Sequence, residues 1–150
     1  MQSPAIEAAR IAVNRYRVVL LLAAIYEGLL GLAFLFFSGP VFRVLGIEFA
    51  ADPVYVQLAA GLIAIMGLGF YFAWRNPLIN SDVVRLGAVF KAFYVLLALY
   101  AQIRGELPDR LFLLFAGIDV VFFLVFLLCL RDTSAARAAL AGLAVGRTAP

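Results

Sequence analysis

Hydrophobic residues gather in four long runs that short polar segments separate. The runs cover residues 18–37, 54–74, 84–103 and 111–130. Each is close to the roughly 20 residues that an α-helix needs to cross a bilayer. The segments between them carry Gly, Pro and Asn, which typically end helices. The pattern predicts an all-α integral membrane protein, a bundle of four transmembrane helices with short loops, in a single domain over residues 1–150.

The segments outside the four runs predict smaller elements. Ser3 and Pro4 suit a helix start, and residues 4–16 are expected to form an interfacial helix before the first span. Ser38-Gly39-Pro40 is expected to end that span, and the VFRVLG segment that follows is expected to form a short surface helix. The Ala-rich tail, residues 132–150, is expected either to form a weak surface helix or to lack regular structure.

Composition supports the membrane assignment. The chain is 66% hydrophobic and 14% charged, whereas soluble domains average roughly 45–50% and 25%. The net charge of +3 comes from basic residues placed mainly at span ends, so no nucleic-acid partner is expected and the bilayer is the expected surrounding. Eight arginines lie on the side of the two termini and three on the other: Arg10, Arg15, Arg17, Arg75, Arg85, Arg131, Arg137 and Arg147, against Arg43, Arg104 and Arg110. Basic residues favour the cytoplasmic side, which predicts that both termini are cytoplasmic.

Three of the spans carry an ionisable residue near the middle of the bilayer: Glu27, Lys91 and Asp119. A charge at that depth costs about 2.5–3.5 kcal/mol on insertion scales. Helical rise places Glu27, Lys91 and Asp119 about 13, 10 and 18 Å from the inner edge. Because side chains lean toward their helix N-terminus, Glu27 and Lys91 are expected to pair. Asp119 is expected to need another partner, such as Tyr94, or a proton.

These residues support three interpretations. They can form a structural polar clamp between helices, or a site for a polar ligand headgroup or protons. Alternatively, Lys91 extends toward the inner interface without pairing. The candidate ligand-binding residues, or intramembrane polar cluster, are therefore Glu27, Lys91, Asp119 and Tyr94.

Residue inventory limits the chemistry. The chain has no histidine and one cysteine, Cys129. Histidine-ligated haem, the common zinc sites, a Ser-His-Asp triad and a CxxC redox motif are therefore excluded. No catalytic or metal-ligating residues are predicted, and the identity of any cofactor stays open. Small residues at Ala60 and Ala64 predict a close contact between the second span and another helix.

A family resemblance follows from several of these features taken together. They are YEGLLGLAFLF in the first span, a GP loop, a Gly/Ala-rich second span that ends in FYFAWR, and Lys91 and Asp119 in the last two spans. The chain resembles small bacterial four-span membrane proteins of the DoxX-like group. The resemblance implies a multi-pass protein of the bacterial inner (plasma) membrane and an accessory role beside quinone-linked or redox complexes. No catalytic motif accompanies it.

Three functions remain open at this point. The first is a non-enzymatic accessory subunit or a helical bundle that binds a small hydrophobic ligand, such as a quinone or another lipid, within a larger membrane complex. The second is a small oligomeric transporter, with a homodimer as its simplest form, that couples a proton or solute through Glu27, Lys91 and Asp119. The third is a membrane enzyme that uses the two carboxylates as acid and base, for which the sequence offers no substrate signal.

Overall fold

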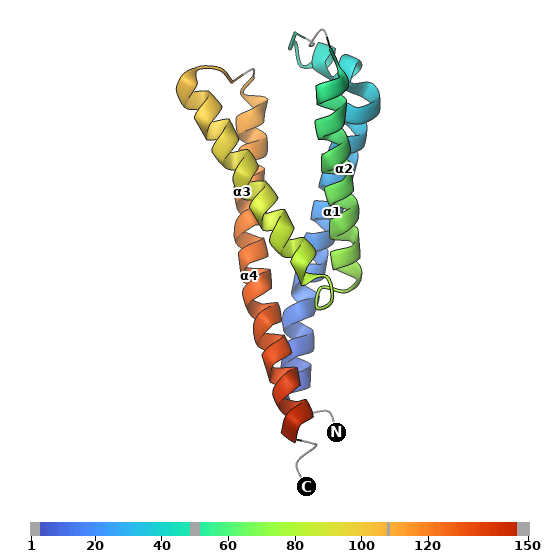
Figure 1. Ribbon diagram of the computed structural model, residues 1–150, viewed down its shortest axis with the longest axis vertical. Coiled ribbons are helices and arrows are strands. Elements are labelled where there is room, and N and C mark those ends of the chain that lie inside the picture. The colour runs from blue at the N-terminus through green and yellow to red at the C-terminus, as the bar shows by residue number, and fades with distance from the viewer. Residues whose placement is uncertain (1–3, 49–51, 108, 147–150) are drawn as a thin grey trace.

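Four helices make up the protein, as a computed structural model that describes residues 4–48, 52–107 and 109–146 shows (Figure 1). They are α1 (Pro4–Val44), α2 (Val54–Arg75), α3 (Ser81–Arg104) and α4 (Leu111–Gly146). The described ranges contain no strand. Each helix contains a stretch that is long and apolar enough to cross a membrane: Val13–Val44, Val54–Arg75, Ser81–Arg104 and Leu111–Ala138. The prediction of an all-α fold with four such helices is therefore confirmed.

The first helix is longer than predicted and has a kink near its end. Residues 4–16 do not form a separate helix but continue into the first span, because no helix-breaking residue lies between the two. Near the other end, Phe37 leaves helical geometry with φ −127° and ψ 27°. Pro40 explains this break, because it lacks an N–H and its ring collides with the carbonyl of the residue four positions earlier. The helix resumes and ends at Val44, so the predicted stop at residues 38–40 is a kink.

Both connections at the ends of α3 are short and hydrogen-bonded. Asn80 precedes α3 but makes no side-chain cap bond to it. Its side-chain amide instead donates to the carbonyls of Phe72 and Asn76, at 3.0 and 3.1 Å, and so holds the end of α2. Gly105 ends α3 in the left-handed conformation, with φ 70°, which glycine adopts without steric cost.

The helices form two antiparallel pairs, α1 with α2 and α3 with α4, which diverge as a V (Figure 1). We call the end of the molecule where α1 begins and α4 ends the terminal end, and the opposite end the loop end. Toward the terminal end α1 also packs against α4, whereas α2 and α3 have the smallest contact of any neighbouring helices. The V is therefore closed at the terminal end and open at the loop end.

Two glycines set the close contact within the first pair. A Cβ atom added at Gly31 would collide with the backbone of Ala60 and Ala64. One added at Gly67 would collide with the backbone of Gly28. The helices approach this closely only because hydrogen atoms replace side chains at those points. The predicted role of Ala60 and Ala64 in a close helix contact is confirmed.

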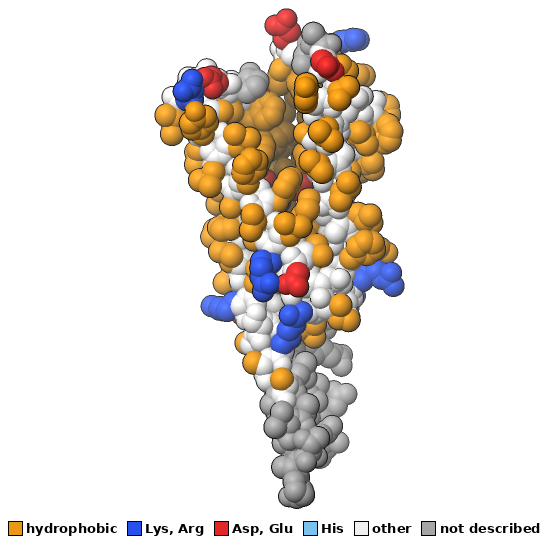
Figure 2. Space-filling view, viewed as in Figure 1, with side chains coloured by type: hydrophobic (Ala, Val, Ile, Leu, Met, Phe, Trp, Pro, Cys, Tyr) orange, Lys and Arg blue, Asp and Glu red, His pale blue; other side chains and the backbone are white. Residues whose placement is uncertain are grey.

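Most of the buried core lies toward the terminal end. Its members come from all four helices: Tyr16, Leu20, Ala23, Phe70, Ala73, Val84, Ala88, Phe126 and Cys129. Beyond it, Asp132 of α4 accepts hydrogen bonds from Tyr16, at 2.7 Å, and from Arg15. The α4 helix extends through residue 146, so the first part of the predicted Ala-rich tail is helical. On the face drawn in Figure 2, apolar side chains cover most of the surface between the loop end and the basic side chains nearer the terminal end.

Candidate functional site

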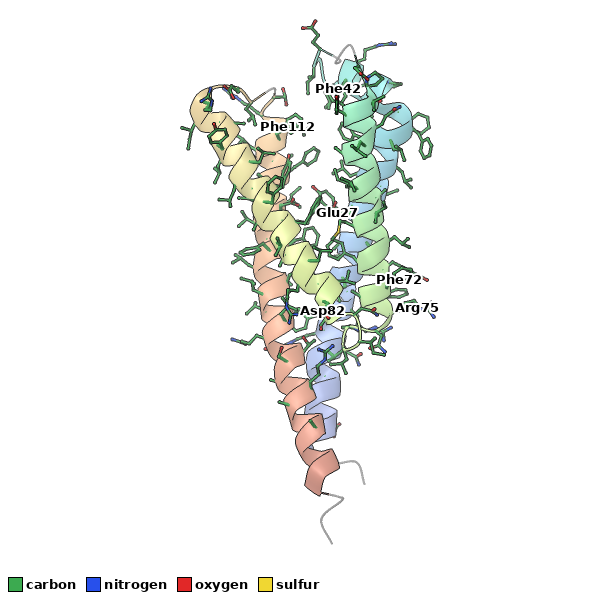
Figure 3. All side chains as sticks on the ribbon, in the orientation of Figure 1. Glu27, Phe42, Phe72, Arg75, Asp82 and Phe112 are labelled. Carbon is green, nitrogen blue, oxygen red and sulfur yellow. The ribbon has the colours of Figure 1, made fainter. Side chains whose placement is uncertain are left out.

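Three helices bring one ionisable residue each to the same place. Lys91 of α3 donates through its ammonium group to Oε1 of Glu27 on α1 and to Oδ1 of Asp119 on α4, the latter at 2.6 Å. Lys91, Glu27 and Asp119 are 1%, 2% and 4% exposed. We call these three residues the charged cluster. Figure 3 labels Glu27, whose side chain extends from α1 into the space between the two helix pairs.

The predicted pair of Glu27 and Lys91 is confirmed, but the expectation that Asp119 needs a different partner is wrong. The heights predicted for Lys91 and Asp119 differ by too much to allow contact. Helical rise places the two residues about 8 Å apart along the bilayer normal. The inclination of α3 in Figure 1 and the long lysine side chain bridge that separation.

Two further expectations about the cluster are settled by its geometry. Lys91 does not reach an interface, because only 1% of its surface is exposed. Tyr94 does not bond to Asp119; its hydroxyl donates to the backbone carbonyl of Phe112, at 3.3 Å. Tyr94 therefore links α3 to α4 one helical turn from Lys91, and it lies near Asp119 without a hydrogen bond to it.

Two aromatic rings that the sequence reasoning missed stand beside the lysine. The ammonium nitrogen of Lys91 lies 5.1 Å from the ring centre of Tyr26 and 5.5 Å from that of Phe122. The two rings stack on each other with centres 5.7 Å apart. Aromatic faces attract cations at this distance. Their positions in the sequence could have indicated this, since Tyr26 adjoins Glu27 and Phe122 lies three residues after Asp119, on the same face of its helix.

Each carboxylate of the cluster has a second oxygen with a different environment. Oε1 of Glu27 and Oδ1 of Asp119 accept from Lys91, whereas Oε2 and Oδ2 accept no hydrogen bond from any described residue. Neither is fully enclosed, because within the described residues only the hydroxyl of Ser81 is both enclosed and without a partner. Each of these two oxygens therefore keeps a small accessible area, although Glu27 and Asp119 as a whole are buried.

A hollow lies between the helix pairs, on the loop-end side of the cluster. Figure 2 shows it as a dark recess with apolar walls and with acidic atoms at its floor, at the height where Figure 3 labels Glu27. Below the floor, the rings of Phe70 and Phe126 pack with centres 5.0 Å apart. Gly87 lies against both rings and leaves no room for a side chain. The hollow is thus open toward the loop end and closed toward the terminal end.

No protein-family model, no curated protein and no solved structure matches the chain. The geometry provides two carboxylates and one ammonium, aromatic faces beside them and an apolar hollow above them. This arrangement can bind a small, mainly apolar molecule that carries one polar group.

Proposed function

We propose that the protein is inserted in the bacterial inner membrane with four spans and both termini in the cytoplasm. The apolar outer surface in Figure 2 supports insertion, because large side chains such as Leu29, Phe36 and Leu96 are about two-thirds exposed, at 66%, 69% and 66%. In the sequence, eight arginines lie on the side of the two termini and three on the other, and this bias supports the orientation. The resemblance to the DoxX-like group is consistent with this location.

Topology is tested with reporter fusions. A periplasmic reporter placed after Gly46 or Gly105 is expected to be active, and one placed after Arg147 inactive. Periplasmic activity of the Arg147 fusion would contradict the proposed topology.

Within that membrane we propose that the protein is a non-enzymatic bundle that holds a small hydrophobic ligand in the hollow, as a unit by itself or as an accessory subunit. The observation that carries the proposal is the charged cluster at the floor of the hollow, with a free oxygen on each carboxylate. Polar groups at the end of an apolar cavity fix the orientation of a ligand whose body fills the rest. Burying three ionisable groups is costly, and a purely structural clamp gains no benefit from leaving two oxygens open.

Saturable photolabelling tests this function. The purified protein in lipid nanodiscs is irradiated with a small apolar alcohol that carries a diazirine, and the labelled peptides are mapped by mass spectrometry. Labelling in the hollow is expected to saturate and to fall when 4-phenylbutanol is added in excess. Labelling of lipid-facing residues is expected to rise linearly and to resist competition.

A matched pair of variants locates the labelled site. Val95 lies one turn from Lys91 on the same face of α3 and is half-buried, whereas Leu96 is 66% exposed. Val95→Trp is expected to fill the hollow and abolish the saturable fraction, and Leu96→Trp is expected to preserve it. Saturable labelling that is equal in both variants would place the ligand elsewhere and refute the proposed site.

A second candidate function is transport, in which a dimer couples a proton or solute to the cluster. One observation favours it: the hollow is open at one end, and packed aromatic rings at Phe70 and Phe126 close the other. One-sided access is one of the two states that alternating access requires. Purification from native membranes in mild detergent separates the candidates, because a homodimer supports transport and a stoichiometric complex with other subunits supports the accessory role.

A further inference from the structure

The charged cluster contains one more negative than positive charge when all its groups are ionised. Glu27 and Asp119 oppose the single ammonium of Lys91. Among the described residues, the other titratable groups near the cluster are the hydroxyls of Tyr26 on α1 and Tyr94 on α3, which are neutral in their usual form. The second helix adds no charge at this level, because its only charged residue is Arg75 at its last position.

An unbalanced charge at this depth is costly, so a further positive charge is expected in the cluster. Electrostatic interactions are much stronger in the low-dielectric interior of a membrane protein than in water. The excess charge can be cancelled by a proton on one carboxylate or by a cation in the hollow. The free oxygens of Glu27 and Asp119 keep a small accessible area, and Figure 2 shows acidic atoms at the floor of the hollow, so either form of positive charge can reach the cluster from the open side.

We propose that the site binds a small lipophilic amine in its ammonium form, in exchange for a proton held by the cluster. This inference rests on the proposed ligand-binding function and defines the class of its ligand. The ammonium group of the amine donates to the free oxygens of Glu27 and Asp119, and the apolar body of the amine occupies the hollow. One proton leaves as one cation enters, so the net charge of the cluster is unchanged and no covalent bond forms.

The donor set favours an organic cation over a metal ion. Metal cations that prefer oxygen take about six ligands, whereas the cluster offers two free carboxylate oxygens. Among the described residues, no three side chains of the kinds that commonly bind metals gather in one place. An ammonium group needs up to three acceptors, and the faces of nearby Tyr26 and Phe122 suit a cation with an apolar body.

Three probes of one shape and different charge test the proposal. They are 4-phenylbutylamine, 4-phenylbutanol and 4-phenylbutyrate, titrated by calorimetry into the protein in nanodiscs, with empty nanodiscs as the blank. The amine is expected to bind at least about tenfold more tightly than the alcohol, and the carboxylate is expected not to bind. The amine titration is repeated in two buffers of different ionisation enthalpy. The difference in the heat of binding gives the number of protons released, and about one proton per amine is expected.

Variants link the preference to the cluster. Asp119→Asn leaves one carboxylate, Glu27, opposite the one ammonium of Lys91, so the cluster is neutral. We therefore expect the amine to lose its roughly tenfold tighter binding relative to the alcohol and to release no proton, while the alcohol still binds. Glu27→Gln is expected to give the same result and replaces Asp119→Asn if that variant does not fold. Asp82→Asn is the control, because Asp82 is 83% exposed and pairs only with Arg85 on the surface.

The outcomes separate this inference from the function on which it rests. If the alcohol binds as tightly as the amine, or no proton is released, the hollow binds ligands and the charge-exchange inference is wrong. If neither the amine nor the alcohol binds, both the inference and the proposed function fail. Unchanged amine binding in both Asp119→Asn and Glu27→Gln would also overturn the inference, since the ammonium group then lies elsewhere.

Discussion

Lys91 is the residue whose removal most directly tests the physical account of the charged cluster. Lys91→Met keeps most of the side-chain volume but removes the positive charge and both ion pairs. It leaves two carboxylates that are 2% and 4% exposed beside each other. Removing one partner of a buried pair typically costs about 3–5 kcal/mol, and here one change strands two groups. We therefore expect Lys91→Met to lose about 3–5 kcal/mol of unfolding free energy at neutral pH.

A much smaller effect is expected when either acid is replaced. Asp119→Asn leaves Glu27 and Lys91 as a balanced pair, and the amide oxygen can still accept from Lys91. The expected loss is below about 1 kcal/mol, the value of a single neutral hydrogen bond. Lys91→Met is therefore expected to lose much more unfolding free energy than Asp119→Asn, although each variant removes one charge from the same cluster.

Unfolding by SDS in dodecyl maltoside micelles provides the measurement. The fluorescence of Trp74, the only tryptophan in the chain, reports contact between α1 and α2. Its ring lies 5.8 Å from the guanidinium carbon of Arg17, whose Nε donates to the Trp74 carbonyl at 3.1 Å. Lowering the pH is expected to restore part of the stability of Lys91→Met, because carboxylates that take up protons no longer repel each other.

A control and a clear contrary result complete the test. Arg85→Met removes an exposed ion pair with Asp82 and is expected to cost at most about 1 kcal/mol. If Lys91→Met is as stable as the parent, or if Asp119→Asn costs as much as Lys91→Met, the charge imbalance does not govern the cluster. A cation in the hollow would then have no electrostatic driving force.

Two further changes test the packing at other points of the molecule. Gly31→Ala is expected to lose about 1–3 kcal/mol of unfolding free energy in the same SDS titration, because the added methyl group collides with the α2 backbone. Gly61→Ala places its methyl group in open space, so its unfolding free energy is expected to be unchanged or slightly higher. Equal effects of the two would show that α1 and α2 separate at little cost. Tyr16→Phe removes the hydroxyl that donates to Asp132 and is expected to cost about 1 kcal/mol, while Tyr55→Phe, at an exposed position, is expected to change nothing.

The sequence alone determined the number and approximate position of the helices. Hydrophobic runs of bilayer length and the Gly, Pro and Asn residues between them are local features, so they can be read without knowing which segments meet. Glu27, Lys91 and Asp119 also stood out in the sequence, because an ionisable side chain in such a run is costly unless a partner compensates its charge. The pairing of Glu27 with Lys91 followed from their similar depth and from the lean of both side chains toward the same side of the bilayer.

Tertiary structure decided the rest of the site. The contact of Lys91 with Asp119 depends on the inclination of α3 and on the reach of the lysine side chain, which the hydrophobic pattern does not specify. The places of Tyr26 and Phe122 beside the lysine depend on how the helices are rotated about their axes. The hollow exists because α1 and α2 stay in contact toward the loop end, at Gly31, while the packing of Phe70 and Phe126 around Gly87 joins the two pairs only toward the terminal end. Such contacts between distant segments are set by packing in three dimensions, and a linear pattern of apolar residues is compatible with many of them.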